Sequence, residues 1–191
     1  IKKKISDGAK RNKYRDYLDF SIGFVTRGCF RKCSFCVNRK YDRVFKASPI
    51  EEFLDPSRPK IYLWDDNIMA SPDFNEIIDA LIATGKPFQF RQGLDIRLMT
   101  AEKAKKLSKA KYYGDYIFAF DHIEDKELIS KKLKLWREYN QASTKLYVLT
   151  GYDSQDEIDI KNTFERIKIL MTYGCLPYIM RYESYKNSRF K

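Results

Sequence analysis

The stretch Phe20-Ser-Ile-Gly-Phe-Val-Thr-Arg-Gly-Cys-Phe-Arg-Lys-Cys-Ser-Phe-Cys36 joins an apolar run to a dense group of thiols. The apolar run predicts a β-strand over 20–26. Cys29, Cys33 and Cys36 then follow within eight residues. Three thiolates on one short loop can converge on a single metal centre, and they leave one coordination position that the loop cannot fill. The spacing therefore predicts a metal centre directly after the first strand.

Disulfide bonds and structural zinc agree less well with this spacing. A disulfide framework is disfavoured, because the chain has only four cysteines in 191 residues and three of them are crowded together. A structural zinc site usually combines Cys-x2-Cys with a second pair of Cys or His ligands. Only Cys33 and Cys36 have that spacing, which leaves Cys29, Cys175 and the single His122 as further zinc ligands. We expect Cys175 to be a buried thiol and His122 to be a structural residue.

The composition is that of a folded domain. Hydrophobic residues make up 43% of the 191 residues and aromatic residues 15%, which is enough to bury a core in one domain. No apolar run approaches the roughly 20 residues that a membrane-spanning helix needs. With reduced cysteines and no visible export signal, we expect a cytoplasmic protein without a membrane partner.

The net charge of +11 is distributed unevenly along the chain. Residues 1–16 carry seven Lys and Arg against two Asp, and residues 27–46 carry another seven against one Asp. Such a surface attracts polyanions, with RNA as the main candidate, although solvated positive faces without a partner are also common. We find no sequence signature of a nucleic-acid-binding module.

Apolar β-rich runs alternate with amphipathic segments along the rest of the chain. This alternation predicts an α/β fold of six parallel strands joined by helical crossovers. We expect residues 1–17 to be a basic lead-in and residues 18–191 to be a single core domain. The predicted strands cover 20–26, 60–64, 87–90, 116–120, 145–149 and 178–182. The predicted helices begin near Ser48-Pro49 and at Thr100, and cover 72–84, 125–140 and 155–173.

The cysteine spacing resembles the cluster-binding loop of the radical S-adenosylmethionine (radical SAM) enzymes. The likeness covers the three cysteines, the aromatic Phe35 before the last of them, and the strand upstream. It implies a (β/α)6 partial barrel of the TIM type, whose cluster loop follows the first strand. It also implies a [4Fe–4S] cluster held by Cys29, Cys33 and Cys36, with S-adenosylmethionine (SAM) on the fourth iron.

In that family, an electron from a donor such as flavodoxin or ferredoxin cleaves SAM to methionine and a 5′-deoxyadenosyl radical. The radical then abstracts hydrogen from a substrate. The resemblance also implies positions for cofactor contacts, because the carboxyl ends of parallel strands meet at one edge of the fold. Phe35 is expected near the SAM adenine, or as a cap on the mouth of the barrel. The other candidates are Asp65, Asp66 and Asn67 after the second strand, Arg91, Asp121, Thr150, Gly151 and Arg181.

These candidates keep structural alternatives. Asp65, Asp66 and Asn67 can hold a ligand ammonium, or can form the turn that precedes a helix. Arg91, Gln92 and Asp95 can line the cavity, or Arg97 can pair with Asp95 on the surface. The sequence leaves the substrate open between RNA, as in methylthiotransferase-like enzymes, a peptide and a small molecule. A second hypothesis is a non-catalytic iron–sulfur or zinc module that binds nucleic acid.

Overall fold

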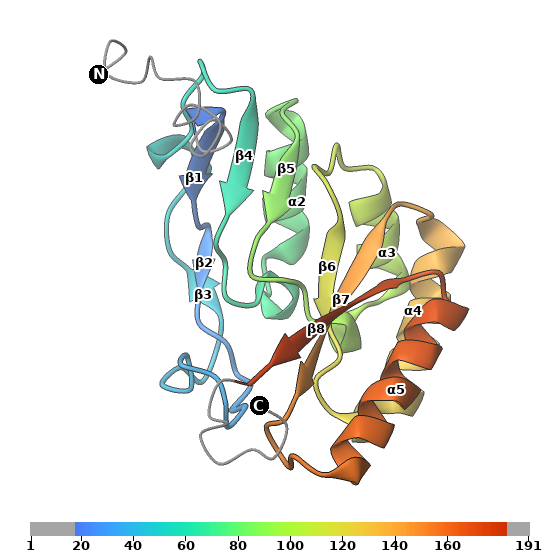
Figure 1. Ribbon diagram of the computed structural model, residues 1–191. Helices are drawn as coiled ribbons and strands as arrows, with labels where there is room; N and C mark the ends of the chain where they lie inside the picture. The colour runs from blue at the N-terminus through green and yellow to red at the C-terminus, as the bar shows by residue number, and fades with distance from the viewer. Residues whose placement is uncertain (1–17, 183–191) are drawn as a thin grey trace, which may run out of the picture.

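The computed structural model describes residues 18–182, so the predicted lead-in at 1–17 lies outside the described residues. The chain is an α/β protein in which parallel strands alternate with helices (Figure 1). The predicted α/β class is therefore confirmed. Six strands run parallel in two sheets that follow chain order, β1-β4-β5 and β6-β7-β8. The strands are β1 (Phe20–Gly23), β4 (Lys60–Leu63), β5 (Phe88–Phe90), β6 (Tyr116–Ala119), β7 (Thr144–Thr150) and β8 (Leu176–Arg181).

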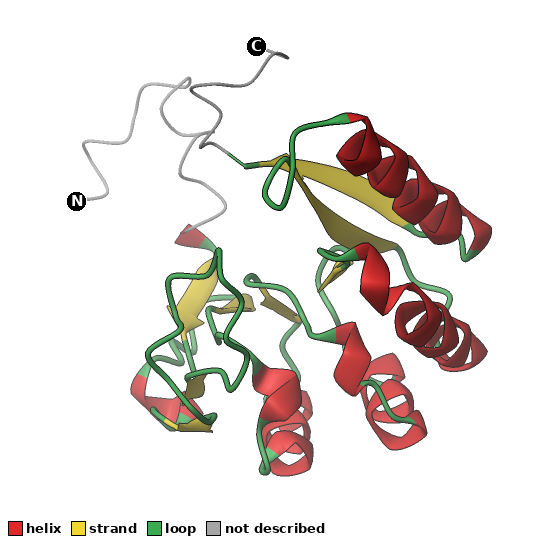
Figure 2. Cartoon of the chain, turned by 90° about the horizontal axis from the view of Figure 1, so that it is seen from below, coloured by secondary structure: helices red, strands yellow, loops and turns green. Residues whose placement is uncertain are grey.

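Isolated bridges continue the parallel pairing from the first sheet to the second. Phe88 pairs with Tyr112, and Leu94, just beyond β5, pairs with Phe118 of β6. The helices lie on the outer side of an arc, and the strands lie on its inner side (Figure 2). The α-helices are α2 (Phe74–Ala83), α3 (Ala101–Ser108), α4 (Lys126–Tyr139) and α5 (Glu157–Thr172). Short 3-10 turns are η1 (Ile50–Glu52), η2 (Ile68–Ala70), η3 (Ile96–Leu98) and η4 (Ile123–Asp125).

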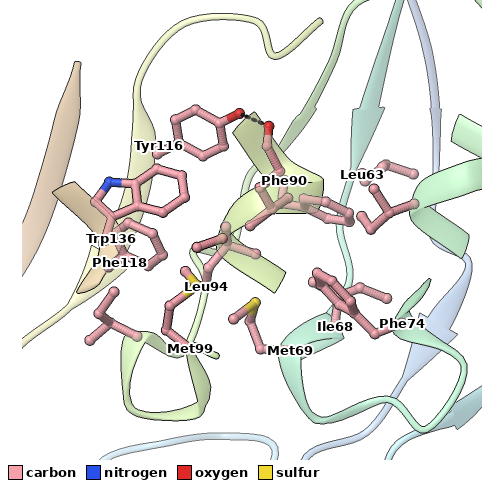
Figure 3. Close-up of a cluster of buried hydrophobic side chains, with 14 of the residues drawn as sticks. Leu63, Ile68, Met69, Phe74, Phe90, Leu94, Met99, Tyr116, Phe118 and Trp136 are labelled. Atoms are coloured by element: carbon pink, nitrogen blue, oxygen red, sulfur yellow. Dashed lines mark hydrogen bonds between the residues drawn. The ribbon is translucent and has the colours of Figure 1, made fainter. Parts of the chain in front are cut away.

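The hydrophobic core fills the space between the strands and the helices. Leu63, Phe90, Phe118 and Trp136 lie in this cluster and are almost fully buried (Figure 3). Burying each such side chain contributes roughly 1.5–3 kcal/mol. The one polar atom of the Trp136 ring is also satisfied there, because its Nε1 group donates to Thr144 Oγ1 over 3.0 Å. This packing fixes the strands on which the candidate site is built.

The later helices agree with the sequence analysis because their caps are local. Thr100 accepts a hydrogen bond from the Lys103 amide and begins α3, as predicted. Asp156 accepts from two amides in the first turn of α5. Gly85 and Gly174 adopt positive φ after α2 and α5, at the predicted ends of these helices.

Two predictions near the amino terminus are wrong. The predicted strand 20–26 is divided, because the chain leaves β1 at Gly23 and forms a separate strand β2 (Thr26–Arg27). β2 pairs antiparallel with β3 (Phe45–Lys46), a pair that the sequence analysis did not predict. The helix expected at Ser48-Pro49 is only the 3-10 turn η1, since Pro56 disfavours helical backbone at Asp55.

Among the residues that the structure describes, no helix has the combined length and apolar character required to cross a bilayer.

Candidate functional site

The cysteine loop, residues 28–44, connects β2 to β3 at the carboxyl end of the first sheet (Figure 1). Gly28 begins it with a φ of +90°, in the left-handed region. A Cβ atom at this position would overlap the carbonyl oxygen of Arg43. Position 28 therefore requires glycine, which lets the backbone turn tightly into Cys29.

Asp66, just after β4, fastens both arms of this loop. Its Oδ2 atom accepts from the Gly28 amide over 2.7 Å, and its Oδ1 atom accepts from Asn38 Nδ2 over 2.8 Å. The Arg27 guanidinium lies 3.8 Å from the same carboxylate. Because the side chain is only 6% exposed, these charge-assisted bonds are protected from water. One carboxylate therefore joins the residue before the first cysteine to a residue after the last.

Asp65 fixes the chain that enters the loop. Its Oδ1 atom accepts from both the amide and the hydroxyl of Thr26 over 2.6 Å, and its Oδ2 atom accepts from the Val25 amide over 3.4 Å. Burial raises the pKa of this carboxyl to about 6, although the bonds from Thr26 and Val25 oppose the shift. Both oxygens are engaged within the chain, which favours the structural alternative for Asp65 over contact with SAM.

Asn67 lies against the first cysteine. Its Nδ2 atom donates to Cys29 Sγ over 3.3 Å, while its Oδ1 atom is buried with no partner among the described residues. Backbone amides of Arg31 and Asn38 donate to the sulfurs of Cys29 and Cys36, each over 3.4 Å. Hydrogen bonds of this kind stabilise thiolates and tune iron–sulfur clusters. The orphaned oxygen marks a place where a donor from a bound molecule would be satisfied.

The three thiols are not positioned to bind one metal ion together. Within residues 18–182, no group of three or more His, Cys, Asp or Glu side chains is placed to hold one ion. A single ion draws its ligands close together, whereas a four-iron cluster takes each cysteine on a different iron. The pKa of Cys33 is raised, chiefly by its burial, with Arg97 opposing and Asp121 and the two other thiols adding to the shift. The loop thus offers three free thiols, two of which accept a hydrogen bond from a backbone amide, and the cluster and the zinc alternative both stay predictions.

A chain of ion pairs connects the cysteine loop to the segments that follow β5 and β6. Arg31 Nε lies 2.9 Å from Asp95 Oδ2, and Arg97 Nε lies 2.8 Å from Asp95 Oδ1. Arg97 also reaches Asp125, at 2.9 Å, before α4. The Asp95 side chain is 8% exposed, and the two arginines lower its pKa against the effect of burial. The suggested pairing of Arg97 with Asp95 is therefore confirmed, but in a sheltered position rather than on the surface.

Phe35 packs against the ends of β6 and β7. Its ring centroid is 5.9 Å from that of His122 and 5.4 Å from that of Tyr152. Both partners line a cavity of about 210 Å³ that reaches the amino-terminal part of α5. His122 Nδ1 is 3.1 Å from Asp153 Oδ2, so the single histidine has the partner expected of a structural residue. Phe35 therefore contacts two of the residues that line this cavity, and both alternatives for its role stay predictions.

Asp121 faces this cavity from the end of β6. Within the described residues no hydrogen bond reaches its carboxylate, and burial raises its pKa, with His122, Arg97 and Arg166 opposing. Arg166 is 2% exposed and is held by the carbonyl oxygens of Phe120 and Asp121. The cavity thus holds a sheltered carboxylate whose oxygens are available to a ligand.

Arg91 lies on the inner face of the first sheet. Its Nη1 atom donates to Gln89 Oε1 over 3.0 Å, and its guanidinium stands 4.9 Å from the ring of Tyr62. On the second sheet, Tyr147 and Tyr178 are register partners with ring centroids 5.5 Å apart. Side chains alternate across strands, so these groups point away from the helices. The expectation that Arg91 lines an interior surface agrees with this placement.

Thr150, Gly151 and Arg181 lie elsewhere. All three line a groove of about 360 Å³ between β8 and α5, together with apolar residues such as Phe164. The Gly151 amide donates to Asp159 Oδ2 over 2.9 Å, so this glycine is tied to the first turn of α5. The structure therefore places these three residues beside the Asp121 cavity, which shares Asp159, and does not bring them to the cysteines.

The sequence analysis missed two residues of the site. Asn38 ties the far arm of the loop to Asp66, and Tyr152 lines the cavity and packs edge-on against Phe35. The only sequence signal for either residue is its position. Asn38 is a polar residue soon after the third cysteine, and Tyr152 is an aromatic residue just after a predicted strand.

The fold is similar to that of the crystal structure of Streptococcus suis SuiB bound to S-adenosylmethionine, with a TM-score of 0.58 and 12% sequence identity. The match covers 96% of this chain and 45% of the SuiB chain, so this chain spans less than half of that protein's length. No protein-family model matches the sequence, and no curated protein matches it significantly. At this identity the likeness shows a shared fold.

Proposed function

We propose that this chain is a SAM-using enzyme of the radical SAM type, built on a (β/α)6 partial barrel. Two independent findings support the proposal. The fold is similar to that of a protein crystallised with SAM, and a loop with three closely spaced thiols stands at the carboxyl ends of the parallel strands. The observation that carries most weight is the fixation of this loop by Asp65, Asp66 and Asn67.

In this proposal Cys29, Cys33 and Cys36 hold a [4Fe–4S] cluster. When bound, the cluster would supply the electron, received from a donor such as flavodoxin or ferredoxin, that cleaves the SAM sulfonium. The protein binds, orients and shields. Asn67 Oδ1, which is buried without a partner among the described residues, accepts a hydrogen bond from the SAM amino group.

The cavity below Phe35 takes the nucleoside part of SAM. The Asp121 carboxylate accepts from hydroxyl groups, and Phe35 together with Tyr152 excludes water from the adenine. Arg91 faces the substrate from the inner face. We assign Asp65 and Asp66 to holding the loop. Contact of Thr150, Gly151 and Arg181 with SAM stays a prediction, because their groove adjoins the cavity.

The test is anaerobic. The protein is reconstituted with iron and sulfide, its iron and sulfide contents are measured, and 5′-deoxyadenosine is quantified after addition of dithionite and SAM. Cys33→Ala is expected to lose bound iron and 5′-deoxyadenosine together. Cys175→Ala is the matched control, since Cys175 is a buried thiol beside Arg137, away from the loop.

Two results would contradict the proposal. One is a folded, iron-free Cys33→Ala protein that still forms 5′-deoxyadenosine. The other is a fully loaded wild-type protein that neither binds SAM in equilibrium dialysis nor cleaves it, which would favour the non-catalytic nucleic-acid-binding module.

A further inference from the structure

The outer side of the cysteine loop carries cations that the described part of the chain does not neutralise. Arg39, Lys40 and Arg43 are exposed and take part in none of the ion pairs found among residues 18–182. The neighbouring Lys32, by contrast, lies 2.5 Å from Asp42. Three uncompensated charges within five residues form a local positive surface, which binds phosphates more readily than evenly spread lysines do.

Aromatic rings lie next to these charges. Phe30 and Phe45 are 41% and 39% exposed, and both line a groove of about 530 Å³ between β3 and η2. Arg43 lines the same groove. Elsewhere on the loop, the Arg31 guanidinium stands 4.8 Å from the ring of Phe30, and Lys40 Nζ stands 5.0 Å from the ring of Tyr41. The surface thus interleaves flat apolar faces with cations.

Two acids also line this groove, but both are engaged. Asp42 pairs with Lys32, and Asp73 lies 3.3 Å from Lys46 Nζ. The groove lining carries two basic residues, Arg43 and Lys46, against these two acids, and Arg43 has no acidic partner among the described residues. The Arg43 guanidinium, with the exposed rings of Phe30 and Phe45 in the same groove, favours an occupant that carries both a negative charge and a flat apolar face.

We propose that this surface binds single-stranded nucleic acid, with phosphates on Arg39, Lys40 and Arg43 and a base stacked on Phe30 or Phe45. Base-on-ring stacking combined with cations that follow the backbone is how proteins hold unpaired strands. The inference rests on the proposed function in one respect: it names a polynucleotide as the substrate class of the proposed enzyme, because Phe30 directly follows Cys29 in the cysteine loop. Binding itself needs neither SAM nor an electron.

The test measures binding by the fluorescence anisotropy of a labelled oligouridine of about 12 nucleotides, a length within the usual site sizes. The salt concentration is varied between about 50 and 200 mM, a range in which phosphate contacts are strongly weakened. The triple variant Arg39→Gln, Lys40→Gln, Arg43→Gln is compared with Lys105→Gln, Lys131→Gln, Lys134→Gln. The second triple removes the same charge from exposed positions on α3 and α4.

Only the triple variant at Arg39, Lys40 and Arg43 should change the salt dependence of the binding constant. Each single-strand phosphate contact contributes about 0.7 to the slope of log K against log salt, so three lost contacts should flatten the slope by about 2. Phe30→Leu should weaken binding about fivefold or more through lost stacking. Phe164→Leu, which alters an exposed ring on α5, should leave the affinity unchanged.

The outcomes separate this inference from the proposed function. No binding at the lowest salt, or equal losses in the two triples, would overturn it, while 5′-deoxyadenosine formation without substrate would be unaffected. Equal affinity for duplex and single strand, with no effect of Phe30→Leu, would also overturn it. The same measurement with oligodeoxyuridine shows whether the surface prefers RNA or DNA. Tighter binding of either single strand than of duplex supports the inference.

Discussion

Gly28 is the residue on which the cysteine loop depends most directly. Gly28→Ala would place a left-handed backbone on a residue with a Cβ, at about 1–2 kcal/mol, and would add the overlap with Arg43. Gly85→Ala is the control, since Gly85 has a φ of +68° but nothing within 4 Å of the added Cβ. We expect thermal unfolding to show a larger loss for Gly28→Ala, accompanied by reduced iron loading. Equal losses for the two variants would mean that Arg43 moves aside freely.

Asp65 should give the protein an unusual dependence on pH. Its folded pKa is about 6, above the ordinary value of 3.8, so the folded state holds the proton more tightly than the unfolded state does. The contribution of Asp65 to stability is therefore greatest below about pH 4 and declines as the pH rises to 6, by roughly 3 kcal/mol. Asp65→Asn keeps an acceptor for Thr26 and removes the titration.

Urea unfolding of the iron-free protein from pH 4 to 7 measures this effect. As the pH rises from 4 to 7, the wild type should lose unfolding free energy relative to Asp65→Asn. Parallel curves would show that the bonds from Thr26 and Val25 hold the pKa near its ordinary value.

Among the elements, the loop between β2 and β3 should loosen without global unfolding when Asp66 is removed. Asp66→Ala leaves the Gly28 amide and Asn38 without their acceptor, and bonds to a charged group contribute about 1.5–3 kcal/mol. Tryptic cleavage at Arg39 should therefore accelerate about tenfold or more. Asp42→Ala, which breaks an exposed pair in the same loop, should change the rate little. Similar rates in both variants would contradict the assigned role of Asp66.

The predictability of an element depended on how local its determinants are. The starts of α3 and α5 are determined locally, because Thr100 and Asp156 cap them from adjacent positions, and both helices lie where the sequence predicts them. The division of the first strand could not be predicted, because it depends on Asp65, which lies 39 residues from Thr26. The same holds for the site: the cysteines were visible as a motif, whereas their fixation arises from contacts between distant strands.

At the scale of the whole molecule, the Arg31–Asp95–Arg97–Asp125 chain joins the cysteine loop to the segments that follow β5 and β6. Arg97→Met would leave the sheltered Asp95 with one partner fewer, and we expect a loss of about 2–4 kcal/mol in urea unfolding. Lys126→Met, which breaks an exposed pair with Glu165, should cost at most about 1 kcal/mol. Because the folded pKa of Asp95 is lowered, the contribution of the network should disappear as the pH falls below the ordinary range of an aspartate. A loss in Arg97→Met no greater than that in the control would contradict this role.

The contacts that fix the cysteine loop also impose an order on biosynthesis. Gly28 and Cys29 are hydrogen-bonded to Asp66 and Asn67, and each partner lies 38 positions later in the chain. At roughly 5–20 residues per second, a ribosome needs about 2–8 s to add those residues. The nascent thiols therefore emerge before their supporting carboxylate and amide exist, and they are open to oxidation or stray metals during that interval. Under the proposed function, loading of the cluster would therefore follow the synthesis of Asp66 and Asn67.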